Sequence, residues 1–315
     1  MSRDHLPYFS RRAVVRAGTL ASLCAALPGG LFAADSKLAP ITKAIPSTGE
    51  KLPVIGVGTN HFGRADFADV SAVLRRMAEL GGTVIDTAAG YGDSEAVIGK
   101  ALKGQGLREK MFIATKLTPN GSPNDPVGGK GSFERSLQRL GNIDLIFVHH
   151  VDGVEQLMPL MVDLKKQRRV RYIGFTSISS EEYPQVLQYL RKYPVDFLQT
   201  NYAIGDRAAE AEVLPLARER KVAVMVATPF GGGRAPLLPR TQGHELPQWA
   251  ADFGATTWGQ FLLKYVVSHP AVTCAIPGTT QVTHLEDDQA AGHGRLPDAP
   301  MRKKMEDYWD KSFKS

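Results

Sequence analysis

Five short apolar runs in this chain end in polar or ionisable side chains, and the last of the five carries two of them. The six residues are Asp86, Lys116, His149, Ser177, Gln199 and Asn201. A strand that is buried on both faces of a parallel sheet should be apolar along its whole length, so polar ends need another explanation. If the runs are parallel strands, their carboxyl ends meet at one rim, and the six side chains converge on one cavity.

Taken singly, the ionisable residues have ordinary structural explanations. Asp86 could cap a helix or a turn, Lys116 could be a solvated strand end, and His149 could be a hydrogen-bonded core histidine. Independent structural roles would scatter over both rims of a sheet, whereas these residues share one end of successive runs. Their common position therefore favours a catalytic or binding site.

The elements that must position these residues alternate between short apolar runs and longer helical patterns. The eight runs are Val54–Thr59, Thr83–Thr87, Phe112–Leu117, Ile143–His149, Tyr172–Ser177, Phe197–Tyr202, Ala223–Thr228 and Val272–Pro277. The helical patterns are Phe67–Leu80, Ser94–Lys103, Ser132–Leu140, Val154–Gln167, Glu181–Arg191, Ala208–Lys221, Thr256–His269 and Val282–Ala291. This alternation predicts βα units around a parallel sheet, and eight such units predict a closed (βα)8 TIM barrel of the α/β class.

Two further features complete the expected domain. Ile41–Pro53 predicts a small β-hairpin before the barrel, with its turn near Ser47-Thr48-Gly49. No internal repeat and no linker rich in Pro, Gly or Ser divides the chain, so residues 35–315 are predicted to form one domain. The longest irregular stretches, Pro119–Gly131 and Gly231–Pro247, follow strands and should lie over the carboxyl-end mouth of the barrel.

Residues 1–34 have the order of an export signal. A basic region with Ser10-Arg11-Arg12 and Arg16 precedes the uncharged segment Ala17–Ala34, which ends in small residues. The paired arginines resemble a twin-arginine signal, which exports proteins that are already folded. The alternative is a membrane anchor, but the apolar stretch is broken by glycine and proline and is short for a span of about 20 apolar residues. We therefore expect recognition by the twin-arginine export machinery, a periplasmic location and no stable membrane span after cleavage.

Composition argues against several other functions. The chain has 315 residues, of which 43% are hydrophobic and 22% charged, as in an ordinary globular protein. Residues 1–34 hold four Arg and one Asp and so contribute half of the formal charge of +6. No basic stripe with interleaved aromatic residues remains, so we do not expect nucleic-acid binding. No cluster has metal-ligand spacing, and Cys274 is the single cysteine after residue 34, so no internal disulfide can form there.

Four sets of short segments resemble signatures of the aldo-keto reductase family. They are Val54–Thr59, Ile85–Gly92 with Ser94-Glu95, Thr115-Lys116 with Val148-His149, and Ile276–Thr279. The likeness spans residues 41–292, and the segments occur in the family's order. It implies a (βα)8 barrel that transfers a hydride between NADP or NAD and an aldehyde or ketone, or the corresponding alcohol. Carried over residue by residue, the catalytic tetrad is Asp86, Tyr91, Lys116 and His149.

Carbonyl reduction needs residues of these types. Hydride delivery to a carbonyl carbon leaves negative charge on the oxygen, so a proton donor and an electrostatic stabiliser must lie beside it. Tyr91 can donate the proton, although a free phenol, with a pKa of about 10, is a poor donor near neutral pH. A Lys116 ammonium held by Asp86 makes a neighbouring phenol more acidic. His149 can orient the carbonyl; its neighbour His150 is the rival for that role, and strand alternation favours His149.

The resemblance also implies a set of cofactor-binding residues. Those around the nicotinamide are Thr176, Ser177, Gln199 and Asn201. Gly231 lies in a Gly-rich loop that is a candidate for the pyrophosphate, and the adenosine end matches Gly278, Thr279, His284 and Asp288. Two departures concern the nicotinamide: Thr176-Ser177 replaces the commoner Ser-Asn, and Ala227 stands where many relatives place a stacking aromatic ring.

A further departure concerns the choice between NADP and NAD. Many relatives have Lys and Arg where this chain has Gly278 and His284. A well-formed contact between a cation and a phosphate contributes about 1 to 3 kcal/mol, so its loss should leave only a weak preference for the 2′-phosphate. Backbone amides at the start of a helix can still bind phosphate oxygens.

Two other functions stay open at this point. A Schiff-base lyase would use the Lys116 amine as a nucleophile, which requires an unpaired amine, whereas Asp86 is expected to pair with it. A barrel that binds a cofactor or another ligand without turnover is suggested by Ala227 and by export away from the cytoplasmic cofactor pool. The complete tetrad favours the reductase over both.

Overall fold

The computed structural model describes residues 39–232 and 235–313. The predicted export signal, residues 1–34, lies outside the described residues. In the described part, no helix is both long enough and apolar enough to cross a membrane.

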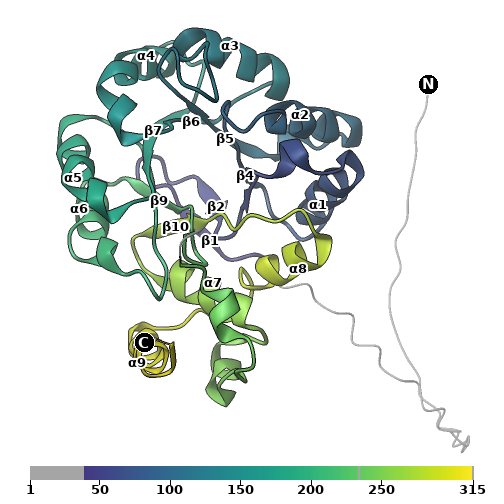
Figure 1. Cartoon of the computed structure of the whole chain (residues 1–315), viewed down its shortest axis with the longest axis vertical. Coiled ribbons are helices and arrows are strands. Elements are labelled where there is room, and N and C mark those ends of the chain that lie inside the picture. Colours follow the sequence, from purple (N-terminus) through teal and green to yellow (C-terminus); the bar gives the residue numbers. More distant parts are fainter. Residues whose placement is uncertain (1–38, 233–234, 314–315) are drawn as a thin grey trace, which may run out of the picture. The chain divides into compact units, whose positions relative to one another are not determined.

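Eight parallel strands form the barrel, as predicted (Figure 1). They are β3 (Val57–Gly58), β4 (Val84–Asp86), β5 (Phe112–Leu117), β6 (Leu145–Val148), β7 (Tyr172–Ser177), β8 (Phe197–Thr200), β9 (Ala223–Val226) and β10 (Val272–Ala275). Each strand pairs with the next along the chain, and two parallel bridges, Ile55 to Ala275 and Gly58 to Gly278, join the first strand to the last. The predicted (βα)8 fold is therefore confirmed.

Helices surround the barrel on its outer side, as Figure 1 shows. They are α1 (Phe67–Glu79), α2 (Ser94–Gln105), α3 (Gly129–Leu140), α4 (Val154–Lys166), α5 (Tyr183–Lys192), α6 (Val213–Glu219), α7 (Trp258–Ser268), α8 (Val282–Ala290) and α9 (Ala299–Phe313). Short 3-10 helices are η1 (Phe62–Arg64), η2 (Arg108–Lys110), η3 (Val151–Gly153), η4 (Ser180–Glu182), η5 (Ala208–Glu210), η6 (Leu238–Thr241) and η7 (Gln248–Phe253).

One predicted helix is broken in the structure. The pattern over Ala208–Lys221 predicts a single helix, but the chain forms η5 and then α6, which begins at Val213. Pro215 lies near the start of α6, where its missing amide hydrogen breaks no bond within the helix, so its position favours a helix that begins at Val213.

The predicted hairpin is present, and the barrel interior is filled with side chains. Strand β1 (Thr42–Ala44) pairs antiparallel with β2 (Lys51–Pro53). One cluster of buried side chains joins the hairpin to the interior of the barrel: Ile45, Leu52, Val84, Phe112, Ala114, Leu145, Phe147, Tyr172, Phe197, Ala223, Met225, Cys274 and Ile276. Burial raises the pKa of the Cys274 thiol to about 12, so this cysteine is a protonated core residue.

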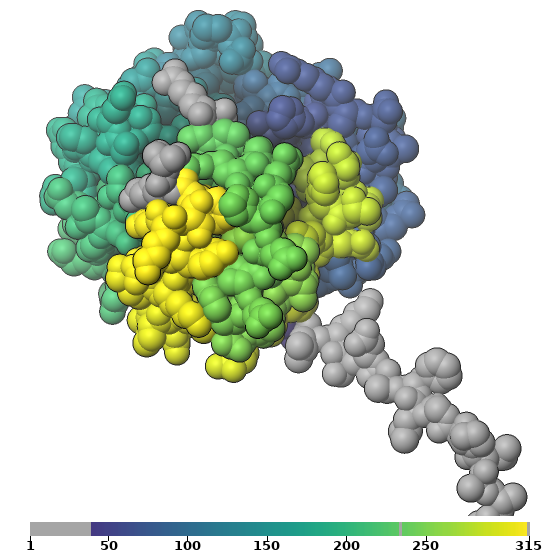
Figure 2. All heavy atoms as spheres, turned by 60° about the horizontal axis from the view of Figure 1, so that its bottom comes forward, coloured from purple at the N-terminus to yellow at the C-terminus, as the bar shows by residue number. Residues whose placement is uncertain are grey.

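The C-terminal helix α9 packs beside α7. Figure 2 shows this yellow helix against the green segment that contains α7. Aromatic rings form the contact: Tyr308 lies 5.7 Å from Trp249 between ring centroids, and Phe313 lies 5.4 Å from Trp258. These tryptophans are therefore packing residues of the outer layer.

The start of α2 fixes the turn that follows β4. Ser94 Oγ donates to the Thr59 carbonyl at 3.0 Å and lies 3.1 Å from Thr87 Oγ1. Next to it, the fully buried carboxylate of Glu95 accepts a hydrogen bond of 2.7 Å from the Thr115 hydroxyl. Residues 87–94 are thus held at both ends against the rim of the barrel.

Two glycines of α2 give a matched test of this packing. A Cβ at Gly99 would lie 1.8 Å from the Arg139 carbonyl oxygen, whereas a Cβ at Gly104 would meet no atom within 4 Å. Gly99→Ala should therefore destabilise the fold by about 1 to 3 kcal/mol or more. Gly104→Ala should stabilise it by about 0.5 to 1 kcal/mol, because alanine has the higher helix propensity. Urea unfolding measures both, and a stable Gly99→Ala variant would contradict the close approach of α2 to α3.

Candidate active site

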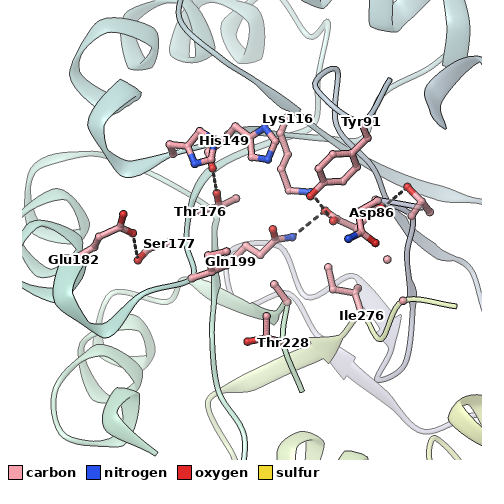
Figure 3. Close-up of a pocket in the computed structure, with 17 residues that line it drawn as sticks. Asp86, Tyr91, Lys116, His149, Thr176, Ser177, Glu182, Gln199, Thr228 and Ile276 are labelled. Carbon is pink, nitrogen blue, oxygen red and sulfur yellow. Dashed lines mark hydrogen bonds and ion pairs between the residues drawn. The ribbon is translucent and has the colours of Figure 1, made fainter. Parts of the chain in front are cut away.

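A cavity of about 210 Å³ opens at the carboxyl ends of the strands (Figure 3). Its lining residues are Gly58, Thr59, Asn60, Asp86, Tyr91, Lys116, His149, His150, Thr176, Ser177, Ile178, Glu182, Gln199, Ala227, Thr228, Ile276 and Gly278. Five of the six polar strand-end residues line this cavity, and Asn201 does not. The barrel rim therefore brings together residues that are far apart in the sequence.

A buried ion pair lies at the bottom of the cavity. Lys116 Nζ donates to Asp86 Oδ2 at 2.5 Å and to the Thr87 carbonyl at 2.9 Å, and the exposed fraction of both side chains is below 5%. Burial opposes charge on the amine, but the charges and hydrogen bonds of Asp86 and Tyr91 outweigh it and raise the pKa of Lys116. Burial also raises the pKa of Asp86, against the pull of Lys116 and Gln199. We assign an ammonium to Lys116, because its amine has two oxygen acceptors.

Tyr91 projects over this ion pair from the turn after β4. The Lys116 amine lies 5.0 Å from the centroid of the Tyr91 ring, and Figure 3 shows the phenol oxygen beside it. The ring of His149 lies 5.4 Å from the Tyr91 ring, edge to face. A phenol, an ammonium and an imidazole therefore share one corner of the cavity.

His149 faces this corner more closely than its rival His150. Burial, then the charges of Lys116 and His150, lower the pKa of His149 to about 3, so its imidazole is neutral at pH 7. Its Nδ1 atom is buried without a hydrogen-bond partner among the described residues. The His150 ring stacks on it at 4.4 Å and is exposed. His149 thus faces Tyr91 as a neutral imidazole, the form that can hydrogen-bond a carbonyl.

The predicted nicotinamide residues divide into two groups. Thr176, Ser177 and Gln199 line the cavity; Thr176 donates to the His149 carbonyl, and Gln199 Nε2 donates to Asp86 Oδ1 at 2.8 Å. Asn201 turns away instead, because its amide oxygen accepts from the Tyr183 hydroxyl and its amide nitrogen donates to Asp206. A role for Asn201 in cofactor binding stays a prediction.

The residues predicted for the rest of the cofactor lie outside the cavity, except for Gly278 at its edge. Gly231 makes a turn with φ +80°, where a Cβ would lie 2.3 Å from the Ala235 carbonyl oxygen. Thr279 is partly exposed and its hydroxyl accepts from the Gln281 amide, and His284 is exposed on α8. Asp288 is buried on the same helix. Their role in cofactor binding stays a prediction.

Several lining residues carry no strong sequence signal. Glu182, at the end of η4, accepts a hydrogen bond of 2.7 Å from Ser177 Oγ. Ile178 directly follows the polar end of β7, so its position could have marked it, and Thr228 lies two residues after the end of β9. Acidic residues are common at the starts of helices, where they interact with the helix dipole. The sequence therefore did not predict that Glu182 lines the cavity.

The lyase alternative finds little support in the described residues. No group of three or more His, Cys, Asp or Glu among residues 39–232 and 235–313 is arranged to hold a metal ion. A Schiff-base lyase needs an unprotonated and unpaired amine, whereas Lys116 is paired with Asp86 and its pKa is raised. The arrangement instead suits proton donation from Tyr91 beside a fixed positive charge.

Comparisons with known proteins match this chain to enzymes of one family. Residues 54–306 match the sequence profile of the Aldo/keto reductase family. The chain is 30% identical over 274 residues to methylglyoxal reductase YeaE of Escherichia coli (strain K12), covering 82% of this chain and 92% of that protein. It is also 30% identical over 273 residues to aldo-keto reductase str7 of Strobilurus tenacellus, covering 75% and 80%. A solved aldo/keto reductase from Klebsiella pneumoniae, in complex with NADP and acetate, superposes with a TM-score of 0.67 at 25% identity, covering 84% and 93%.

Two adjacent acids on α8, Asp287 and Asp288, give a test of what burial does to a carboxylate. Burial, then the charge of Asp287, raise the pKa of Asp288 well above its usual range. An ionised Asp288 therefore destabilises the fold at neutral and higher pH, and protonation removes that penalty as the pH falls toward the pKa of an unfolded aspartate, about 3.9. Asp288→Asn should stabilise the cofactor-free protein by about 1 to 3 kcal/mol at pH 8, and the gain should shrink at pH 4.

The control for this prediction is Asp287→Asn. Asp287 accepts hydrogen bonds from Thr257 and Gln260, at 2.9 Å and 2.8 Å, so its replacement weakens these contacts while it removes a charge beside Asp288, and it should stabilise the fold less than Asp288→Asn does. Urea unfolding at both pH values measures the two variants. An Asp288→Asn variant that is no more stable than the wild type at pH 8 would contradict the buried ionisation.

Proposed function

This chain belongs to the aldo/keto reductase family, and from that premise we propose that Asp86, Tyr91, Lys116 and His149 carry out its hydride-transfer chemistry on aldehydes or ketones. The observation that supports these roles is the buried pair of Lys116 and Asp86 with the Tyr91 phenol beside the amine. Each residue is then assigned from what its own contacts allow it to do.

Tyr91 donates the proton to the carbonyl oxygen as negative charge develops there. The Lys116 ammonium stabilises the phenolate that remains, since it is fixed by Asp86 and by the Thr87 carbonyl. Neutral His149 provides a hydrogen-bonding nitrogen next to the Tyr91 ring and so fixes the direction of the carbonyl. Because these groups are held before substrate arrives, little reorganisation accompanies the reaction.

The lining of the cavity fits the nicotinamide end of the cofactor. Hydroxyl and amide groups of Thr176, Ser177 and Gln199 lie on one wall and suit a carboxamide, while Ala227 and Ile276 supply apolar surface. When bound, the cofactor supplies the hydride. No aromatic ring stands at Ala227, so we propose that these wall residues, rather than ring stacking, hold the nicotinamide.

We propose a small aldehyde or ketone as the substrate. A cavity of about 210 Å³ must contain the reacting groups of both the cofactor and the substrate. The relative from Escherichia coli carries the name methylglyoxal reductase, which denotes a substrate of this size. Neutral small carbonyls are therefore the first compounds to assay.

Removal of the Tyr91 hydroxyl tests the assigned chemistry. Tyr91→Phe should lower kcat/KM for carbonyl reduction at least a hundredfold, because it deletes the proton donor and leaves the cofactor wall intact. The dissociation constant of the cofactor, from protein fluorescence, should stay within about twofold. Tyr193→Phe, at a partly exposed tyrosine outside the cavity, is the control and should keep full activity. A Tyr91→Phe enzyme with near wild-type rates would refute the assignment.

We further propose that residues 1–34 export the protein to the periplasm through the twin-arginine route. The support is the order of Arg11-Arg12, the uncharged segment and the small residues that end it. Because this route moves folded proteins, the barrel can bind its cofactor before export. Binding at a hundredfold excess over the dissociation constant would stabilise the folded state by about 2.7 kcal/mol.

Exchange of the two arginines tests this route. The double variant Arg11→Lys, Arg12→Lys should remain in the cytoplasm as folded, active enzyme, since the barrel itself is unchanged. Arg16→Lys lies outside the pair and should be exported normally. Osmotic release followed by activity and cofactor assays measures both. Normal export of the double variant would reject the twin-arginine route, and cofactor-free wild-type protein in the periplasm would reject loading before export.

A further inference from the structure

A carboxylate other than Asp86 belongs to the wall of the cavity. Glu182 lines the cavity and accepts the hydrogen bond from Ser177 Oγ at 2.7 Å. Figure 3 shows Glu182 and Ser177 on the opposite side of the cavity from Tyr91. The preceding residue, Glu181, is exposed and does not line the cavity. Glu182 therefore lies one hydrogen bond away from the wall that we assign to the nicotinamide.

The Glu182 carboxylate gives the cavity wall a negative charge near Ser177. Asp86 and Lys116 neutralise each other, and His149 is uncharged. In the described ranges, 39–232 and 235–313, Glu182 forms no ion pair, and its hydrogen-bond partner is the neutral Ser177 hydroxyl. A charge without a counterion acts on whatever occupies the space beside it.

The two forms of a nicotinamide differ in charge at this place. The oxidised ring is positively charged and the reduced ring is neutral, so a neighbouring carboxylate stabilises the oxidised form and has little effect on the reduced form. We propose that Glu182 biases the bound cofactor toward its oxidised form. The inference rests on the proposed function, because it requires the nicotinamide to lie beside Ser177.

The direction of the reaction follows from this bias. Carbonyl reduction moves a hydride to the carbonyl carbon and a proton from Tyr91 to the oxygen, so its products are the alcohol and the oxidised cofactor. Stabilising the oxidised form lowers the reduction potential of the bound couple and shifts the equilibrium on the enzyme toward the alcohol. A tenfold bias corresponds to about 30 mV for a two-electron couple.

The test compares how tightly the protein binds the two forms. Glu182→Gln preserves the shape of the side chain and its ability to accept from Ser177 but removes the charge. Titration of protein fluorescence with NADP⁺ and with NADPH gives both dissociation constants. The ratio of the constant for the oxidised form to that for the reduced form should rise roughly three- to tenfold in Glu182→Gln. Glu182→Asp should stay nearer to the wild type because it keeps the charge.

Glu181→Gln is the matched control, because it removes the same charge one residue earlier and outside the cavity. Its ratio should stay within twofold of the wild type. An unchanged ratio in Glu182→Gln, with both forms bound, would overturn the inference and leave the proposed function standing. Failure of the wild type to bind either form at millimolar concentration would overturn the proposed function, and this inference with it.

Discussion

The buried ion pair of Asp86 and Lys116 is the interaction on which the site depends. Moving two charges from water into a protein interior costs several kcal/mol per ion, and mutual attraction offsets this only when further hydrogen bonds satisfy both groups. Here the Thr87 carbonyl and the Gln199 amide provide them. Loss of either charged partner would leave the other uncompensated, so the pair makes the positions of these side chains interdependent. The presence of this buried ion pair is better explained by the fixed positive charge that it places in the cavity than by a contribution to the free energy of folding.

The barrel supplies the geometry that the pair requires. In the register of the sheet, Asp86 lies opposite Ala114 of β5, so Lys116 lies two residues further along its strand on the same face. Gln199 lies opposite Thr176 of the neighbouring strand. Each side chain is placed by backbone pairing on both sides of its strand. Parallel pairing thus brings Asp86, Lys116 and Gln199 together, and the conformation of the loops does not determine their positions.

Patterns governed by local rules were readable from the sequence. Strands β5 and β7 begin and end where their apolar runs predicted. The residues that flank each run favour turns, so the strand cannot extend beyond it. Asn201 shows where the same rule ends. Strand β8 stops at Thr200, so Asn201 has already left the sheet and bonds to Tyr183 and Asp206 instead.

Other parts of the site depend on packing that no local pattern records. Glu182 looks like an ordinary acid at the start of a helix, and only the path of the chain after β7 brings it to Ser177. The break near Pro215 was missed by the predicted helix Ala208–Lys221, although proline restricts where a helix can begin. Residues that end strands could therefore be predicted more reliably than residues that loops bring to the cavity.

The seam between the first and last strands has a consequence for how the protein is made. Gly58 pairs with Gly278, and Ile55 pairs with Ala275, so contacts between the earliest and latest parts of the barrel close both the sheet and one edge of the cavity. Contacts this far apart in sequence form slowly, because a long loop must close first. During synthesis, the chain cannot complete its cavity until β10 has left the ribosome. The protein can therefore bind a ligand in this cavity only at the end of translation, once the first and last strands have paired.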